Sequence, residues 1–205
     1  SWSVSADGHI WRFNLRQNLK TEDGIEINSS NFAKSLHFRL KHASKTYDVP
    51  AFNLLEGWQE FVSGAADQIE GIRSDQKYIL EFRFIKQPVG LLEYLAMPSF
   101  GFFSPKDYFD AKWNDSNIIH SSGPYKILAQ TPGKITLEAR DGWFSLKPNS
   151  PKKINYYFAS LDDALERANT KSIISARQVP ENYLFPRDVE IIRGAPVFVT
   201  TVVLA

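Results

Sequence analysis

The stretch that most constrains the fold is residues 78–85, where side chains alternate strictly along the chain. One set of alternate positions is wholly apolar or aromatic: Tyr78, Leu80, Phe82 and Phe84. The other set carries the charged residues Glu81 and Arg83. Strict alternation predicts a β-strand with one buried face. We expect a turn at residues 74–75 before this strand, and Pro88 to stop it.

The chain before this strand mixes strand and helix patterns. Residues 2–16 alternate on both sides of Asp7 and Gly8, which predicts a hairpin. Asn28 is expected to cap a helix whose buried side chains recur every four residues. That set is Phe32, Leu36 and Leu40. A second helical stripe is expected over residues 54–62, ended by Gly64.

The chain after the strand begins with a short predicted helix at residues 91–95 and a loop at 97–103. Ser104 and Pro105 then have the character of a helix start, with a serine cap and a proline at the first helical position. Residues 125–130 and 135–140 predict a second hairpin, and residues 154–158 predict a further strand. The last part predicts a helix from Ser160, short strands at 173–176 and 189–192, and a buried β-branched strand at 197–204.

Composition limits the possible classes of protein. The chain has 205 residues, 43% hydrophobic, with 24 basic and 23 acidic side chains. This content supports a packed core, and the balanced charge gives no sign of a nucleic-acid partner. The lack of cysteine excludes disulfides and thiolate chemistry. No apolar run reaches the ~20 residues of a membrane span, and both ends look cut, so we expect a piece of a longer protein.

Catalytic and metal motifs are missing from the sequence. It has no phosphate-binding glycine loop, no GxSxG and no HExxH, and its four histidines lack zinc-ligand spacing, so we expect surface or loop histidines, no metal site and no cofactor. Asp162, Asp163 and Glu166 form an acidic cluster that could serve a hydrolase, but a helix start explains it better. His120 beside residues 121–122 is interpreted as part of a polar turn.

Several short motifs, in order, resemble a known family: the extracellular solute-binding proteins of the oligopeptide, dipeptide and nickel class, which serve ABC importers. The motifs lie at residues 2–16, 23–24, 28–32, 71–88, 97–105, 123–125, 142–148 and 160–174. The turn Gly-Pro-Tyr at 123–125 matches the family's G-T-G-P-Y, although Ser122 replaces the threonine. Asn31 replaces the family's aspartate, and residues 171–175 depart from its G-x-I/V-D. The chain therefore resembles a divergent member.

The resemblance implies a mixed α/β (α+β) fold: part of a periplasmic-binding-protein-like lobe with an additional small α+β domain. Residues 1–122 would form the small domain. Residues 123–205 would form part of the first ligand-binding lobe, ending in the strand that crosses between lobes.

The resemblance also implies a ligand site of which this chain would hold at most half. The expected contacts are Phe198, Thr200 and Thr201 on the crossing strand, with Trp58 and Phe100. Ordinary core packing is the alternative for each, and it is favoured for Trp58. Alternate residues on a strand point in opposite directions, so only some of Phe198, Thr200 and Thr201 could face a ligand.

The implied function is a non-catalytic solute-binding component of an ABC importer, with a peptide or other small solute as ligand. The implied partners are that ligand and the transporter permease, and we expect a monomer. The expected location is periplasmic or extracellular, including attachment as a lipoprotein in the full-length protein. A solute-binding sensor domain of a transcriptional regulator is the open alternative, and a hydrolase using Asp163 or His120 is a third.

Overall fold

The computed structural model describes residues 1–43, 49–97, 100–104, 107 and 120–158, and the backbone of three later strands at 173–176, 190–193 and 201–204. The chain divides into two compact units, Ser1–Leu128 with Leu137–Lys153 and Ala129–Thr136 with Ile154–Ala205. The predicted division after residue 122 stays a prediction. Across the described ranges, no helix combines the length and the apolar character needed to cross a bilayer.

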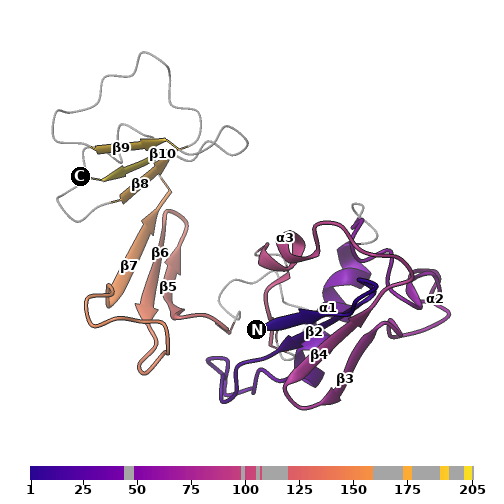
Figure 1. Cartoon of the computed structure of the whole chain (residues 1–205). Helices are drawn as coiled ribbons and strands as arrows, with labels where there is room; N and C mark the ends of the chain where they lie inside the picture. Colours follow the sequence, from indigo (N-terminus) through magenta and orange to yellow (C-terminus); the bar gives the residue numbers. More distant parts are fainter. Residues whose placement is uncertain are drawn as a thin grey trace. The chain divides into compact units, whose positions relative to one another are not determined.

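The first unit is built on a four-stranded antiparallel sheet with the order β1-β2-β4-β3 (Figure 1). Its strands are β1 (Trp2–Val4), β2 (Ile10–Asn14), β3 (Ile72–Gln76) and β4 (Ile79–Arg83). The predicted hairpin forms, and Gly8 takes the left-handed conformation, with φ of 75°, at its turn. The predicted turn at residues 74–75 is wrong, because both residues belong to β3 and the chain reverses at residues 77–78.

Helix α1 (Ser29–Ala43) packs against β3 and β4. The predicted cap is present, since the side-chain oxygen of Asn28 accepts a hydrogen bond from the Asn31 N–H at 2.9 Å. The second helix is shorter than predicted: α2 (Trp58–Ser63) follows Gly57, whose left-handed backbone separates it from Leu54 and Leu55. Gly64, also left-handed, ends α2 as predicted. Helix α3 (Leu91–Ala96) lies where residues 91–95 predict it.

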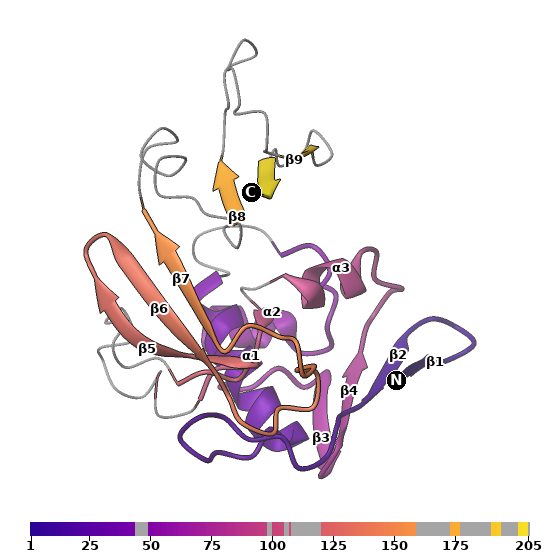
Figure 2. The same ribbon diagram turned by 90° about the vertical axis from the view of Figure 1, so that its left-hand side faces the viewer.

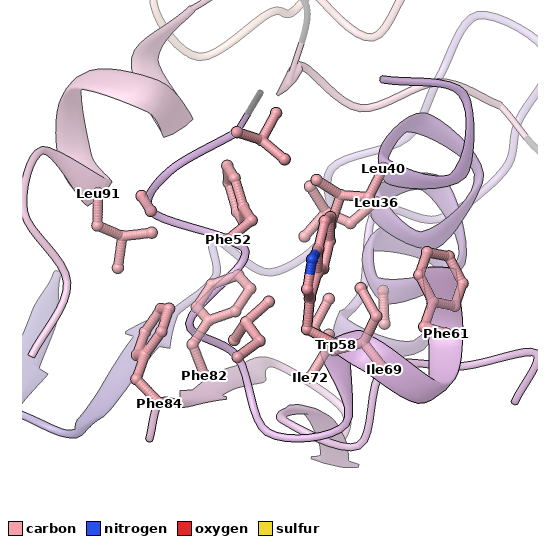
Figure 3. Close-up of a cluster of buried hydrophobic side chains, with 14 of the residues drawn as sticks. Leu36, Leu40, Phe52, Trp58, Phe61, Ile69, Ile72, Phe82, Phe84 and Leu91 are labelled. Atoms are coloured by element: carbon pink, nitrogen blue, oxygen red, sulfur yellow. The ribbon is translucent and has the colours of Figure 1, made fainter. Parts of the chain in front are cut away.

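The core of this unit fills the space between the sheet and the helices (Figure 3). The buried face of β4 is the one that alternation predicts, because Leu80, Phe82 and Phe84 are 0–2% exposed. Leu36 and Leu40 of α1 meet this face, and both are also almost completely buried. The buried face of the alternating strand therefore forms one side of the hydrophobic core.

A second sheet has the order β5-β6-β7, with β5 (Tyr125–Thr131), β6 (Lys134–Ala139) and β7 (Lys153–Tyr157) (Figure 2). The predicted hairpin and the following strand are both confirmed. The third sheet has the order β8-β10-β9, from β8 (Ile173–Ala176), β9 (Glu190–Arg193) and β10 (Thr201–Leu204). β10 is antiparallel to both neighbours and lies between them, a central position that suits its β-branched sequence. The helix predicted from Ser160 lies outside the described residues.

Candidate functional site

The predicted ligand contacts on the crossing strand fall at the end of the chain. Thr201 is the first residue of β10, where its backbone is opposite Ala176 of β8 and Arg193 of β9. Phe198 and Thr200 lie outside the described residues. The strand that should carry the contacts is thus present at the centre of its sheet, and the roles of these three residues stay a prediction.

The two predicted aromatic contacts lie in the hydrophobic core of the first unit. Trp58 is 7% exposed and its ring centroid lies 6.2 Å from that of Phe61, and Figure 3 shows it within the buried cluster. Phe100 is 2% exposed and lies 4.8 Å from Phe52. Core packing, the alternative favoured for Trp58, accounts for both positions. Their role as ligand contacts stays a prediction.

Polar side chains gather at a different place, which we call the polar junction. It consists of Asp23, Ser104, Asp107, His120 and Arg140, together with the backbone of residues 20–24 and 120–124. Two of these side chains, on Ser104 and Asp107, are almost completely buried, at 0% and 3% exposed. Buried polar groups persist only when they are hydrogen-bonded, so the contacts of the junction determine its geometry.

Asp107 and His120 are the most closely paired side chains of the junction. The Nδ1 atom of His120 lies 2.6 Å from one carboxylate oxygen of Asp107, and the backbone N–H of His120 donates to the other at 3.1 Å. The backbone N–H of Asp107 donates to the Ser104 carbonyl at 2.9 Å, as at the predicted helix start. One buried carboxylate thereby holds the chain at residue 120 against the segment around residue 104.

Asp23 joins the same place from the turn at residues 21–24. The Ser104 hydroxyl donates to an Asp23 carboxylate oxygen at 2.9 Å, and the other oxygen accepts from the hydroxyl of Thr21. Gly24 is left-handed, with φ of 86°, and its N–H donates to the Thr21 carbonyl, so Asp23 and Gly24 lie in a tight turn. The turn and the loop ending at Ser104 are thus fixed to each other.

Arg140 follows β6 and holds backbone carbonyls rather than a carboxylate. Its Nη1 donates to the carbonyls of Ser121 at 3.2 Å and Gly123 at 3.1 Å, and its Nη2 donates to the carbonyl of Lys20 at 2.7 Å. The guanidinium also lies 4.7 Å from the ring centroid of Trp143. Burial lowers the pKa of Arg140, and the charge of Glu22 acts in the opposite direction. An arginine remains charged at neutral pH under such conditions.

Comparison with known proteins places the chain in a family. The model of "Bacterial extracellular solute-binding proteins, family 5 Middle" matches residues 1–194, nearly the whole chain. This chain belongs to family 5 of the bacterial extracellular solute-binding proteins. The predicted resemblance is therefore confirmed.

Solved structures give the family 5 chain the same fold. A periplasmic oligopeptide-binding protein from Borrelia burgdorferi is 23% identical over 81% of this chain and 34% of its own, with a TM-score of 0.68. The pheromone receptor PrgZ is 16% identical over 94% and 40%, with a TM-score of 0.75. The substrate-binding domain of an oligopeptide ABC transporter from Bacillus anthracis is 20% identical over 85% and 36%, with a TM-score of 0.68. The chain thus spans 34–40% of the length of these proteins, and the predicted mixed α/β fold is confirmed.

Several of the short motifs on which the predicted resemblance depends meet at the polar junction. The Asp-Gly turn, the Ser104 loop and the Gly-Pro-Tyr turn at 123–125 are far apart in sequence and come together there. The Oγ of Ser122, directly before the Gly-Pro-Tyr turn, donates a hydrogen bond to the Phe102 carbonyl at 2.8 Å. We interpret these motifs as segments that hydrogen bonds hold together in the fold.

The junction does not arrange its hydroxyls as a catalytic triad would. The hydroxyls of Ser121 and Ser122 donate to the backbone carbonyls of Tyr125 and Phe102, and the His120 ring is engaged by Asp107. The interpretation of residues 120–122 as a polar turn fits these contacts. Over the described ranges, no group of three His, Asp or Glu side chains could hold a metal ion.

Sequence reasoning missed two members of the junction. Asp107 has no distinguishing sequence signal, because its pairing with His120 joins two residues thirteen positions apart, which no local pattern reveals. Arg140 was treated as the last residue of a strand. One sequence feature could have indicated this role: Arg140 comes directly after an alternating strand and before Asp141 and Gly142. Its side chain reaches back to the Gly123 carbonyl, just before the hairpin begins.

Proposed function

We propose that this chain is part of the peptide-binding component of an ABC import system, which holds its ligand non-covalently between two lobes. The observation that carries the proposal is the family match over residues 1–194. The names of the similar solved structures add support, since they include oligopeptide-binding proteins and a murein tripeptide-binding protein. Binding by lobe closure requires no covalent chemistry from the protein.

The ligand site proposed for the complete protein includes the crossing strand. The contacts proposed on it are Phe198, Thr200 and Thr201, of which only those on one face of a strand could reach the ligand. Trp58 and Phe100 are also proposed as contacts, and because both rings are almost completely buried, only the edge of a ring could touch a ligand. The rest of the site would come from parts of the protein outside this chain.

The proposed setting follows from the family. The protein would act in the periplasm or outside the cell, as a monomer that delivers its ligand to a membrane permease. Lipoprotein attachment in the full-length protein is part of this proposal.

The test is a thermal-shift screen on the full-length protein. The panel holds di- to pentapeptides, a nickel–histidine chelate and oligosaccharides, with an equimolar mixture of the corresponding free amino acids as the control. A ligand that binds only the folded state stabilises it by about 2.7 kcal/mol at a hundredfold excess over Kd. We expect a clear rise of the melting temperature with peptides alone. A rise with another class only, or with none, would contradict the peptide assignment.

A further inference from the structure

Residues 143–153, which we call the basic segment, differ from the rest of the chain in charge. The segment follows β6 and ends on Lys153, the first residue of β7 (Figure 2). It contains Lys147, Lys152 and Lys153 and no acidic residue, so its net charge is +3. The whole chain carries +1, so the residues outside the segment sum to −2. Positive charge is therefore concentrated in one short part of a chain that is otherwise slightly acidic.

The charge of the three lysines is not neutralised within the described part of the chain. All three side chains are exposed. Among the described residues, lysines pair with carboxylates at Lys77 and Lys126, and none of the three forms such a pair. Asp141, the acidic residue nearest to the segment in sequence, directly follows Arg140, so the two together add no net charge. The lysines are thus available to an anionic partner.

Hydrogen bonds define the path of the basic segment. The Ser150 N–H donates to the Lys147 carbonyl at 2.9 Å, and the Lys147 N–H donates to the Ser150 Oγ at 2.9 Å. The Tyr125 hydroxyl holds the next residue, since it donates to the Pro151 carbonyl at 2.9 Å. The turn at residues 147–150 brings Lys147 back toward Lys152. Their charges therefore act on a partner together, because exposed charges interact over ~10 Å at about 0.1 M salt.

An exposed aromatic ring lies at the start of the segment. Phe144 is 54% exposed. The guanidinium carbon of Arg16 lies 4.0 Å from its ring centroid, and the Trp143 ring centroid lies 5.4 Å away. One cation and one aromatic neighbour thus hold the ring while about half of its surface stays open. Arg16, itself exposed, adds a fourth positive charge beside the segment.

Lysines beside an exposed ring match the surface of an anionic lipid bilayer. A bilayer attracts basic side chains without fixed pairing, which suits flexible lysines, and each one strengthens binding about fivefold. Aromatic rings are favoured at the level of the headgroups. An interface with another protein fits less well, because lysine is depleted at such interfaces relative to arginine and the aromatic residues.

We propose that the basic segment, together with Arg16, is a contact surface for an anionic phospholipid bilayer. The lysines face the headgroup phosphates, and Phe144 enters the interfacial layer. This inference goes beyond the proposed function, because it concerns where the protein is held rather than what it carries. In the setting proposed above, the contact would keep the protein beside the membrane that contains its permease.

Vesicle sedimentation tests the proposal on the full-length protein, prepared without any lipid attachment. The vesicles contain phosphatidylcholine alone, or equal amounts of phosphatidylcholine and phosphatidylglycerol. The first variant combines Lys147→Gln with Lys152→Gln. Its matched control combines Lys34→Gln with Lys86→Gln, which removes the same charge from two exposed lysines outside the segment. Phe144→Ala tests the ring.

We expect the wild type to bind the anionic vesicles, to be released by high salt, and to leave the phosphatidylcholine vesicles unbound. The variant at Lys147 and Lys152 should bind about thirtyfold more weakly, from about fivefold for each lysine. The matched control should bind like the wild type. Phe144→Ala should bind about fivefold more weakly, the loss expected for a half-exposed ring that enters the interface. If Phe144→Ala does not fold, the two lysine pairs decide the result.

Three outcomes would overturn the proposal. Equal weakening in the two lysine pairs would mean that binding follows net charge alone and not the basic segment. Absence of binding to anionic vesicles, or equal binding to both kinds, would exclude an anionic bilayer as the partner and favour an acidic protein surface. The result does not depend on peptide binding. A protein that binds vesicles but no peptide keeps this inference and loses the proposed function.

Discussion

His37 shows how one side chain can carry a structural role that spacing alone does not reveal. The sequence predicted a surface or loop histidine. Its Nε2 instead accepts a hydrogen bond from the Ile69 N–H at 2.9 Å, and its ring centroid lies 5.8 Å from that of Phe61. Only the neutral form of the ring can accept at Nε2. Burial lowers the pKa of His37 from 6.5 and so favours the neutral ring that this hydrogen bond requires.

The pH dependence of stability follows from this lowered pKa. The unfolded chain binds a proton at His37 at a higher pH than the folded chain does. The contribution of His37 to the free energy of unfolding should therefore be complete above about pH 6.5 and decrease as the pH falls below that value. Urea unfolding at pH 7.5 and pH 5.5 measures this. The His37→Gln variant, which cannot titrate there, should lose less stability between the two values. An equal loss in both proteins would contradict the prediction.

The Asp107–His120 pair gives a second prediction. Replacing His120 with Ala leaves the carboxylate of Asp107, 3% exposed, without its ring partner, and a buried charge that loses its partner typically costs about 3 kcal/mol. Urea midpoints of the wild type, His120→Ala, Asp107→Asn and the double variant form a cycle. We expect the double variant to be less destabilised than the two single changes added together. Simple additivity would show that the pair is not coupled.

Strands and helices were predictable wherever periodicity and caps agreed. The hairpin of β1 and β2, the alternating strand β4, the Asn28 cap and the Gly64 stop all appear as their local chemistry indicates. β3 was missed because Ser74 and Asp75 have the character of a turn, and its pairing with β4 overrides that tendency. Helix α2 begins late because Gly57 is left-handed, which no hydrophobic stripe could have indicated.

Gly71, directly before β3, lies close to two other backbone segments of its unit. A Cβ built there would lie 2.4 Å from the Arg83 carbonyl oxygen and 2.8 Å from the Glu56 nitrogen, both backbone atoms. These segments cannot yield easily, because Gly71 is hydrogen-bonded to both: its N–H donates to the Glu56 carbonyl and its carbonyl accepts from Arg83. Glycine is therefore required here by space rather than by φ.

We expect Gly71→Ala to destabilise the protein by about 2 kcal/mol, in the range found for overpacked sites. Gly133→Ala is the matched control, because a Cβ at Gly133 meets nothing within 4 Å. Urea unfolding of the two variants gives the comparison. A stability of Gly71→Ala equal to that of Gly133→Ala would mean that the backbone around Gly71 relaxes freely.

For the chain as a whole, the sequence identified the family and the class of fold, but little of the site. Family motifs are local, so they could be recognised in order. The polar junction is a contact among segments around residues 22, 104, 120 and 140, and such convergence becomes visible only in three dimensions. The aromatic candidates Trp58 and Phe100 came from the family resemblance, and no sequence pattern distinguishes a buried ring from one that lines a ligand site.

The order β1-β2-β4-β3 has a consequence for how this protein is made. The central pair of the first sheet joins Ile10 to Arg83, so the sheet cannot close until the ribosome has released residues far along the chain. Contacts this distant in sequence slow folding, because the intervening loop must be ordered first. The first sheet is therefore expected to form late, only after the residues between β2 and β4 have been synthesised.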